Sequence, residues 1–358
     1  MEYRKRQTAL RQRMAQGGVD GLLVTHLPNV RYLCGFSGSN ALLLVSAARA
    51  LLFTDGRYRE QARQQVVAAT VVVPPQGDLW KAAAARAARL ARIGLDSDHL
   101  SVAQRARWLA HWAGKANGLK AAEGWIEALR AVKEPEEIEA IARAVRLASS
   151  ALLPTLKRYR EGMAETELAG WLEFALRRAG GEGLAFDTIL AGGAHGALVH
   201  AQPSRQPLPP HGFVVIDYGV ILAGYHSDMT RTVHIGKAGS KQRSVYQAVL
   251  DAQLAALAAV RPGATGAAVD AAARRSLRQA GYGNYFPHST GHGVGLEIHE
   301  APRLAARASE CLQAGQVITI EPGVYIPGWG GVRIEDVVQV TEGGAKVLTP
   351  SPKELLIL

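Results

Sequence analysis

The sequence predicts two successive domains of different class, an α/β domain followed by an α+β domain with antiparallel strands. In the first 125 residues, short apolar runs alternate with helical segments, which is the pattern of an α/β domain. Farther on, short strand-like runs containing acidic residues are interrupted by helices, which favours an α+β domain. We therefore expect domains at residues 1–125 and 126–358, and a chain of 358 residues can form two hydrophobic cores.

The elements of the first domain are predicted from apolar runs and the residues at their borders. An opening helix over residues 1–17 should end at Gly17 and Gly18. Short runs rich in Leu and Val predict buried strands. The expected strands lie at residues 21–26, 40–45, 50–55, 70–75 and 93–96. The expected helices lie at residues 57–66, 78–92 and 101–112.

Four helices are expected in the second domain. A long helix over residues 133–156 should begin near Pro135, which suits a first helical turn. An amphipathic helix over residues 161–181 should end at its closing glycines. Two more helices are expected at residues 240–261 and 265–280.

Charge and composition exclude several classes of function. Hydrophobic residues make up 48% of the chain and charged residues 20%, which suits a globular protein rather than a disordered one. The net charge of +10 could suggest nucleic acid, but the 41 basic residues are scattered and form no block interleaved with aromatic residues. We expect no nucleic-acid partner.

Two features predict the compartment. Only Cys34 and Cys311 are present, far apart, which gives no disulfide framework and fits a reducing environment. The charged start lacks the apolar centre of a signal peptide, and no run approaches the roughly 20 apolar residues that span a bilayer. We expect a cytoplasmic protein with no membrane partner.

The most informative stretch is residues 287–300, PHSTGHGVGLEIHE. It places His288, His292 and His299 among three glycines, which argue against a helix and allow close approach to a ligand. Apolar and polar residues alternate over residues 296–299. This alternation predicts a strand with His299 turned away from the apolar face.

Two aspartates follow or open apolar runs upstream of this stretch. Asp217 ends FVVID and Asp228 opens DMTRTVHI, with glycines between them, so the runs should form a hairpin that brings the carboxylates together. Thr230 and Thr232 share a face with Asp228 and could orient it. The alternative is that each aspartate merely occupies a turn.

Two glutamates occupy apolar runs downstream. Glu321 follows ITI and precedes a Pro-Gly turn. Alternation in GVRIED places Arg333 and Glu335 on one face, which could be a surface ion pair of little consequence. The apolar surroundings instead indicate a buried strand, and a buried carboxylate needs a partner or a metal.

The four carboxylates and one imidazole together predict a metal site. Four converging carboxylates repel one another unless cations neutralise them, and two divalent ions would balance the charge. A single imidazole among carboxylates suits Mn²⁺, Co²⁺ or Zn²⁺ more than Ca²⁺. Such a pair can hold a hydroxide that attacks a carbonyl near neutral pH. His195 and His200, in a loop rich in small residues, could be functional or merely structural.

Taken in chain order, these residues resemble the ligands of the dinuclear metallopeptidases with the pita-bread fold, which include methionine aminopeptidase, aminopeptidase P and prolidase. The similarity to the Xaa-Pro branch covers nearly the whole chain. It rests on NVRYLCGFSGSNALLLV, LRAVKEPEEIEAI, DYGVILAGYHSDMTRTV, HSTGHGVGLEIHEAPR, ITIEPGVYI and GVRIEDVV. The resemblance implies a creatinase/prolidase-type N-terminal α/β domain followed by a pita-bread catalytic domain.

The resemblance also implies a role for each metal ligand. Asp217 would chelate one ion with both oxygens, and Asp228 and Glu335 would bridge the two ions. His292 and Glu321 would complete the set. The family leads us to expect Mn²⁺, with Co²⁺ or Zn²⁺ as alternatives, and a homodimer.

Other residues receive catalytic and substrate-binding roles by the same resemblance. Glu321 would pass a proton from the attacking water to the leaving proline nitrogen. His288 and His299 would stabilise the substrate and the developing oxyanion. His200 would bind substrate or shuttle a proton, and Arg333 would hold neighbouring acids in place.

The resemblance implies a prolidase that hydrolyses Xaa-Pro dipeptides, or alternatively an aminopeptidase P that acts on longer peptides with proline at the second position. A metal-free creatinase-type relative or a non-catalytic peptide-binding module would lack the ligands, and all five are present. His226, next to the metal motif, departs from the family pattern, and the sequence gives no account of its role.

Overall fold

The computed structural model describes residues 1–75, 77–114 and 116–358. Within it the chain forms two compact units, Met1–Arg130 and Ala131–Leu358. The junction predicted after residue 125 lies a few residues before this division, in the turn that precedes α6 (Glu127–Ala131). The predicted order of an α/β domain followed by an α+β domain agrees with the elements found in the two units.

The N-terminal unit is built on one mixed sheet with the strand order β4-β3-β2-β1-β5-β6. The central strand β1 pairs antiparallel with β2 and parallel with β5. The strands are β1 (Gly21–Val24), β2 (Ala41–Ser46), β3 (Ala50–Thr54), β4 (Thr70–Val72), β5 (Ile93–Leu95) and β6 (Leu119–Ala121). The helices are α1 (Tyr3–Gln16), α2 (Leu27–Cys34), α3 (Arg59–Gln65), α4 (Leu79–Arg86) and α5 (Val102–His111).

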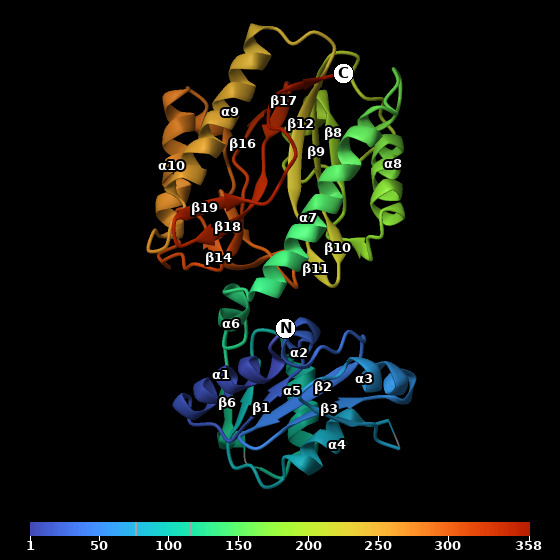
Figure 1. Ribbon diagram of the computed structural model, residues 1–358, viewed down its shortest axis with the longest axis vertical. Helices are drawn as coiled ribbons and strands as arrows, with labels where there is room; N and C mark the ends of the chain where they lie inside the picture. Colours follow the sequence, from blue (N-terminus) through green and yellow to red (C-terminus); the bar gives the residue numbers. More distant parts are fainter. Residues whose placement is uncertain (76, 115) are drawn as a thin grey trace. The chain divides into compact units, whose positions relative to one another are not determined.

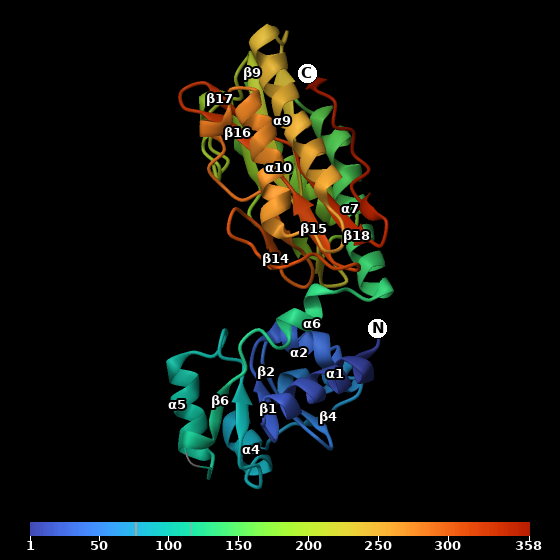
Figure 2. The same ribbon diagram turned by 90° about the vertical axis from the view of Figure 1, so that its left-hand side faces the viewer.

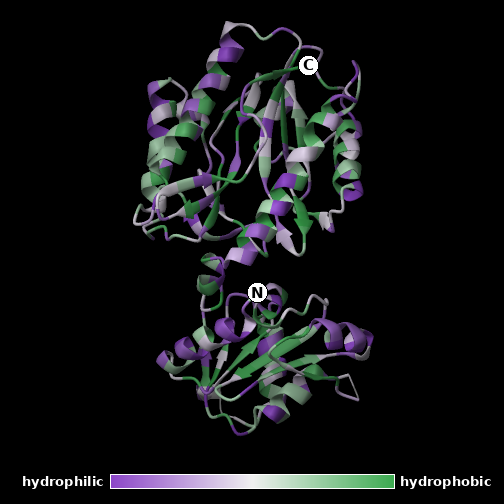
Figure 3. Cartoon of the chain, viewed as in Figure 1, coloured by the Kyte–Doolittle hydropathy of each residue, from purple (hydrophilic) through white to green (hydrophobic). Residues whose placement is uncertain are grey.

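Helices cover both faces of this sheet, with α5 to its left and α1 to its right in Figure 2. Leu42 and Leu44 of β2 pack in one apolar cluster with Trp80 of α4 and Trp108 of α5. The four inner strands, β1, β2, β3 and β5, are accordingly hydrophobic (Figure 3), as expected for strands buried on both sides.

Two differences from the sequence expectations occur in this unit. Helix α2, which was not predicted, has Pro28 in its first turn and ends at Gly35, whose φ of +82° suits glycine. The helix expected at residues 78–92 ends at Arg86, because a turn closed by the Leu90 N–H and the Ala87 carbonyl leads the chain into β5.

The C-terminal unit begins with the predicted long helix α7 (Pro135–Leu156). Pro135 occupies its first turn, and Glu134 and Glu137 form a capping box. The other helices are α8 (Glu165–Arg178), α9 (Ser240–Ala259) and α10 (Gly266–Gln279). In Figure 1, α7 and α8 flank the strands on one side and α9 and α10 on the other.

The strands of this unit form four small sheets, with the orders β11-β10-β7, β20-β12-β9-β8, β14-β13-β15-β18-β19 and β16-β17. The first seven are β7 (Gly183–Leu184), β8 (Ile189–Gly192), β9 (Gly212–Tyr218), β10 (Val220–Leu222), β11 (Tyr225–His226), β12 (Met229–Ile235) and β13 (Gly291–Gly293). The others are β14 (Glu300–Leu304), β15 (Val317–Ile320), β16 (Gly323–Ile326), β17 (Gly330–Arg333), β18 (Asp336–Thr341), β19 (Gly344–Val347) and β20 (Leu356–Ile357).

Two apolar cores hold the unit together. One joins α7 and α8 to β8, β9 and β12. The other joins α9 and α10 to β15, β16, β17 and β18. The unit therefore has two halves, each a pair of helices packed on strands.

Two strand predictions in this unit were wrong. Residues 296–299 form a tight loop, because the Gly295 N–H donates to the carbonyl of Glu297 and the Glu297 N–H donates to the side chain of Glu300. The run expected as one buried strand around Glu335 is divided between β17 and β18. Between these two strands, which belong to different sheets, the Glu335 N–H donates to the Thr230 carbonyl, so the run is interrupted at Glu335.

Candidate metal centre

The first two candidate ligands come from the predicted hairpin. Strands β9 and β12 pair antiparallel, with Asp217 opposite Thr230 and Tyr218 opposite Met229. Asp228 immediately precedes β12, while β10 and β11 form a short excursion between the two long strands. The hairpin therefore brings both aspartates to the same end, as the sequence predicted.

The other three candidate ligands come from the second half of the unit. His292 lies in β13, Glu321 directly follows β15, and Glu335 lies between β17 and β18. Strands β13 and β15 are neighbours in one sheet, which brings His292 and Glu321 together. The candidate site thus lies between the two halves.

Distances confirm that the five side chains converge. Asp217, Asp228 and Glu335 each present a carboxylate oxygen, and these oxygens lie within 4.8 Å of one another. The Nε2 atom of His292 lies 3.6 Å from Asp228 Oδ2 and 3.3 Å from Glu321 Oε1. All five residues therefore lie at one site, with Asp217, Asp228 and Glu335 buried and His292 and Glu321 partly buried, and the structure describes each of them.

Two oxygens in this pocket show that its hydrogen bonding is incomplete. Asp217 Oδ1 and Glu335 Oε1 are buried, and neither has a hydrogen-bond partner among the described residues. The second oxygen of each group is engaged, by Arg333 Nη2 at 2.6 Å and by Thr230 Oγ1 at 2.7 Å. A buried anionic oxygen without a donor is costly, and a cation would satisfy it. The residues present therefore fit divalent ions.

The pKa shifts indicate the same need for positive charge. Burial, followed by repulsion from Glu335, Asp217 and Glu321, raises the pKa of Asp228 well above its usual range. Burial, followed by repulsion from Glu321 and Asp217, does the same to the pKa of Glu335. Without cations these carboxyl groups keep their protons to higher pH than ordinary carboxyl groups do, and metal binding would displace those protons.

Glu321 and His292 behave as an ion pair. Burial opposes the charge of Glu321, but the hydrogen bond and charge of His292 outweigh it and lower the pKa of Glu321 to about 2. The same contact with Glu321 outweighs burial at His292 and raises the pKa of that imidazole.

The remaining predicted residues surround the five ligands. The His299 ring lies 4.4 Å from the His292 ring, centre to centre, and His299 is exposed. Burial lowers the pKa of both His288 and His299, and the charge of nearby His200 lowers each further. Arg333, only 2% exposed, donates to Asp217 as described.

Sequence reasoning missed three polar contacts. The hydroxyl of Tyr325 bonds His288 Nε2 at 2.9 Å and accepts from Arg333 Nη1 at 2.5 Å. Thr319 Oγ1 donates to Glu321 Oε1 at 3.1 Å. Thr319 could have been found by alternation, because it stands two positions before Glu321, whereas nothing in the sequence singled out Tyr325.

The threonines after Asp228 act differently from the prediction. Thr230 donates to Glu335, and Thr232 donates to the carbonyl of Arg333 at 2.9 Å. They therefore connect the two halves of the unit across the site. His226, whose role the sequence left open, donates its backbone N–H to the Gly295 carbonyl at 2.8 Å.

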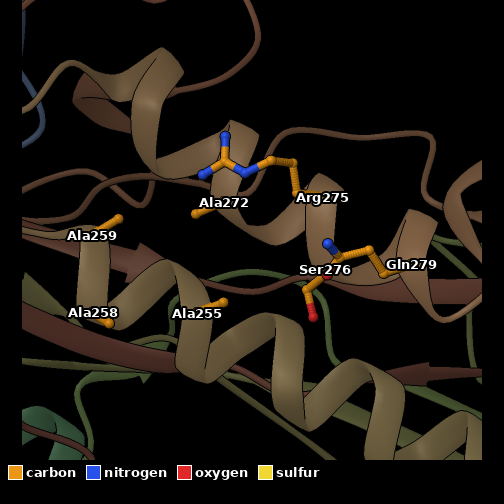
Figure 4. A pocket seen from close by; sticks show the side chains of 7 residues that line it. All are labelled: Ala255, Ala258, Ala259, Ala272, Arg275, Ser276 and Gln279. Carbon is orange, nitrogen blue, oxygen red and sulfur yellow. The ribbon is translucent and has the colours of Figure 1, made fainter.

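An open groove lies elsewhere, between α9 and α10. It is lined by four alanines together with Arg275, Ser276 and Gln279 (Figure 4), and it contains no candidate ligand. Among the described residues no helix has the length and apolar character required to cross a membrane.

Two family models match the chain. The model of metallopeptidase family M24 matches residues 139–342, and that of the Creatinase/Prolidase N-terminal domain matches residues 6–132. With the solved structures below, these matches confirm the predicted fold class, a creatinase/prolidase-type α/β domain followed by a pita-bread domain.

Similar proteins extend over almost the whole chain. A solved Xaa-Pro dipeptidase from Bacillus anthracis superposes with a TM-score of 0.96 at 38% identity, covering 99% of this chain and 100% of that one. A solved X-Pro aminopeptidase from Thermotoga maritima gives 0.89 at 34% identity, covering 97% of this chain and 100% of that one. In Bacillus subtilis, "Uncharacterized peptidase YqhT" is 39% identical over 351 residues, 98% of this chain and 99% of its own.

Proposed function

The chain belongs to metallopeptidase family M24, and on that premise we propose that it is a prolidase, hydrolysing Xaa-Pro dipeptides at the bond before proline. The convergence of four carboxylates and one imidazole in a buried pocket is the observation that supports this proposal most directly. The similarity to the Xaa-Pro dipeptidase of Bacillus anthracis supports the choice of substrate.

The pocket residues fit two divalent ions. Asp217, Asp228, His292, Glu321 and Glu335 would hold them. The strongest sign of such a fit is that one oxygen each of Asp217 and Glu335 has no hydrogen-bond partner within the described part of the chain. We expect Mn²⁺, with Co²⁺ or Zn²⁺ as alternatives, because the donors are mainly carboxylates. Bound there, the ions would lower the pKa of water so that it can attack near neutral pH, and they would polarise the substrate carbonyl.

The chain's own residues would then move protons and orient the peptide. Glu321, held by Thr319 and His292, takes a proton from the attacking water and delivers it to the leaving proline nitrogen. The nitrogen of an Xaa-Pro bond carries no hydrogen, and like any leaving peptide nitrogen it must gain a proton as the bond breaks, here to become the secondary amine of proline.

The histidines around the ligands have supporting roles in this proposal. His299, beside His292, stabilises the negative charge that develops on the carbonyl oxygen. His288, bonded to Tyr325, binds the substrate, and His200 binds substrate or shuttles a proton. Arg333 fixes Asp217 through a short charge-assisted bond.

A second candidate function is that of an aminopeptidase P, which releases the first residue from longer Xaa-Pro peptides. The similarity to the X-Pro aminopeptidase of Thermotoga maritima favours it, since that structure also matches over nearly the whole chain. The two functions share the chemistry at the metal centre and differ in the peptide length they accept.

One experiment tests both candidates. The protein is stripped with a chelator, Mn²⁺, Co²⁺ or Zn²⁺ is added back separately, and turnover of Ala-Pro is compared with that of Ala-Pro-Ala. We expect metal-dependent release of proline from Ala-Pro. Preference for Ala-Pro-Ala would replace the prolidase with the aminopeptidase, and activity that survives metal removal would refute the metal-dependent mechanism. The homodimer stays a prediction, to be measured by light scattering.

A further inference from the structure

Glu165 is a buried carboxylate that the proposed reaction does not use. It is the first residue of α8 and is only 2% exposed. Its oxygens accept hydrogen bonds from the Gly192 N–H at 2.9 Å, the Ser204 N–H at 2.9 Å and the Ser204 hydroxyl at 2.7 Å. The Nδ1 atom of His195 lies 2.9 Å from both oxygens, and it must donate if the carboxylate is ionised.

These donors stand at the two ends of a single loop. Gly192 ends β8, His195 lies in the short helix η3 (Gly193–Ala197), and Ser204 closes the segment. Glu165 does not cap its own helix, because every hydrogen bond of its side chain goes to this loop. A buried charge is retained only where several donors satisfy it, and here they fix both ends of residues 192–204.

The middle of the loop borders the metal centre. Arg333, which binds Asp217, also donates through Nη1 to the Val199 carbonyl at 3.3 Å. His200 follows directly and lies near His288 and His299. Its own ring is exposed and forms no hydrogen bond to another described residue. The location of His200 therefore depends on the backbone of the loop rather than on hydrogen bonds of its side chain.

We propose that Glu165 is a positioning residue, which fixes the loop of residues 192–204 so that His200 stays near His288 and His299. The proposal rests on the proposed function, because it takes His200 to act on the peptide. His195 then has a structural role as the partner of Glu165, although it shares the loop with His200.

The test is a double-mutant cycle on the metal-loaded full chain, with Ala-Pro as substrate. Glu165→Gln keeps the size of the side chain but loses the charge and the two-oxygen contact with His195. We expect it to lower kcat/KM by about 10- to 100-fold, as small misplacements of a reacting group do. In the His200→Ala background the same change should cost less than about 2-fold, because nothing remains to be positioned. Equal losses in both backgrounds would overturn the proposal.

A matched control is Glu167→Gln on the same helix. Glu167 is half-buried and pairs with Arg160 at 2.7 Å, away from the loop, so kcat/KM should change by less than about 2-fold. If Glu165→Gln fails to fold, Ser204→Ala removes a single hydroxyl donor and should lower kcat/KM by about 5-fold, again only when His200 is present. Metal content is measured for each variant and should be unchanged.

Hydrogen exchange separates this proposal from the proposed function. Amides of residues 193–204 should exchange about 10-fold faster in Glu165→Gln than in Glu167→Gln, whatever the substrate. If the wild type cleaves no Xaa-Pro peptide, the proposed function fails, and exchange alone decides whether Glu165 orders the loop. Unchanged exchange in Glu165→Gln would overturn the positioning role even in a fully active enzyme.

Discussion

Replacing Asp228 with Asn should make the metal-free protein more stable, although it removes a proposed metal ligand. Asp228 is 4% exposed, and burial together with its acidic neighbours raises its pKa well above the usual range. When the folded-state pKa is raised, the folded protein binds more protons than the unfolded chain. The contribution of Asp228 to the free energy of unfolding is therefore largest below about pH 3.9, the pKa of an unfolded aspartate. It decreases as pH rises toward the folded-state pKa.

The size of the effect follows from the same linkage. In the pH range where the folded state holds the proton and the unfolded chain does not, the free energy of unfolding falls by about 1.4 kcal/mol per pH unit. Between the unfolded pKa of about 3.9 and pH 7 the cost of keeping Asp228 is thus at most about 4 kcal/mol. Asn has nearly the same shape and no proton to bind, so Asp228→Asn should recover part of this energy in metal-free protein at pH 7.

The assay is urea unfolding of chelator-treated protein at pH 5 and pH 7. Unfolding is monitored by hydrogen exchange of the β12 amides, because these amides report on the C-terminal unit. The wild type should lose stability between pH 5 and pH 7, and Asp228→Asn should lose less. Added Mn²⁺ should stabilise the wild type strongly and the variant weakly, because the variant lacks one ligand.

A buried aspartate outside the site provides the control. Asp270 is 1% exposed, and it accepts hydrogen bonds from Arg274 at 2.7 Å and from the Thr290 hydroxyl at 2.8 Å. Asp270→Asn should therefore destabilise the protein by about 1–3 kcal/mol. The reasoning is refuted if Asp228→Asn behaves like this control, or if metal-free wild type becomes more stable from pH 5 to pH 7.

Three further outcomes are expected. Metal binding at pH 6–7 should release protons, so the heat measured by calorimetry should vary with the ionisation enthalpy of the buffer. The same heat in buffers of different ionisation enthalpy would contradict protonated carboxyl groups in the metal-free site. Arg333→Lys should lower kcat/KM by about 10- to 100-fold, because an ammonium cannot reproduce the bonds to both Asp217 and Tyr325; full activity would contradict this. Gly291→Ala should cost about 1–3 kcal/mol of unfolding free energy, since the new Cβ would lie 2.0 Å from the Thr319 carbonyl oxygen; an unchanged urea midpoint would contradict it.

Much of the fold could be predicted from local pattern. Apolar runs, capping residues and terminal glycines are short-range signals, and they located most of the helices and the long strands. The β9–β12 hairpin was predictable for the same reason, because glycines separate two apolar runs that end and begin with Asp217 and Asp228. Residue types within these runs also indicated the five candidate metal ligands.

Contacts between distant segments could not be predicted in this way. Alternation correctly placed Thr230 on the face beside the site, but its hydroxyl binds Glu335, which is 105 residues away. The apparent strand at residues 296–299 fails because Glu300 bonds back to the Glu297 backbone, a contact that periodicity ignores. The sequence did not single out Glu165, and only the fold shows that its partners are in another segment.

The charges of the site link its stability to its chemistry. Burial and mutual repulsion keep the carboxyl groups of Asp228 and Glu335 protonated to higher pH in the metal-free protein, and two divalent ions would take the place of those protons. Four positive charges on the ions and one on Arg333, which is 2% exposed, would face four carboxylates and the attacking hydroxide. Cations close to the peptide oxygen would favour the negative charge that develops there during hydrolysis. The arrangement that makes the empty pocket unstable is therefore the one that suits the loaded pocket to attack on a peptide bond.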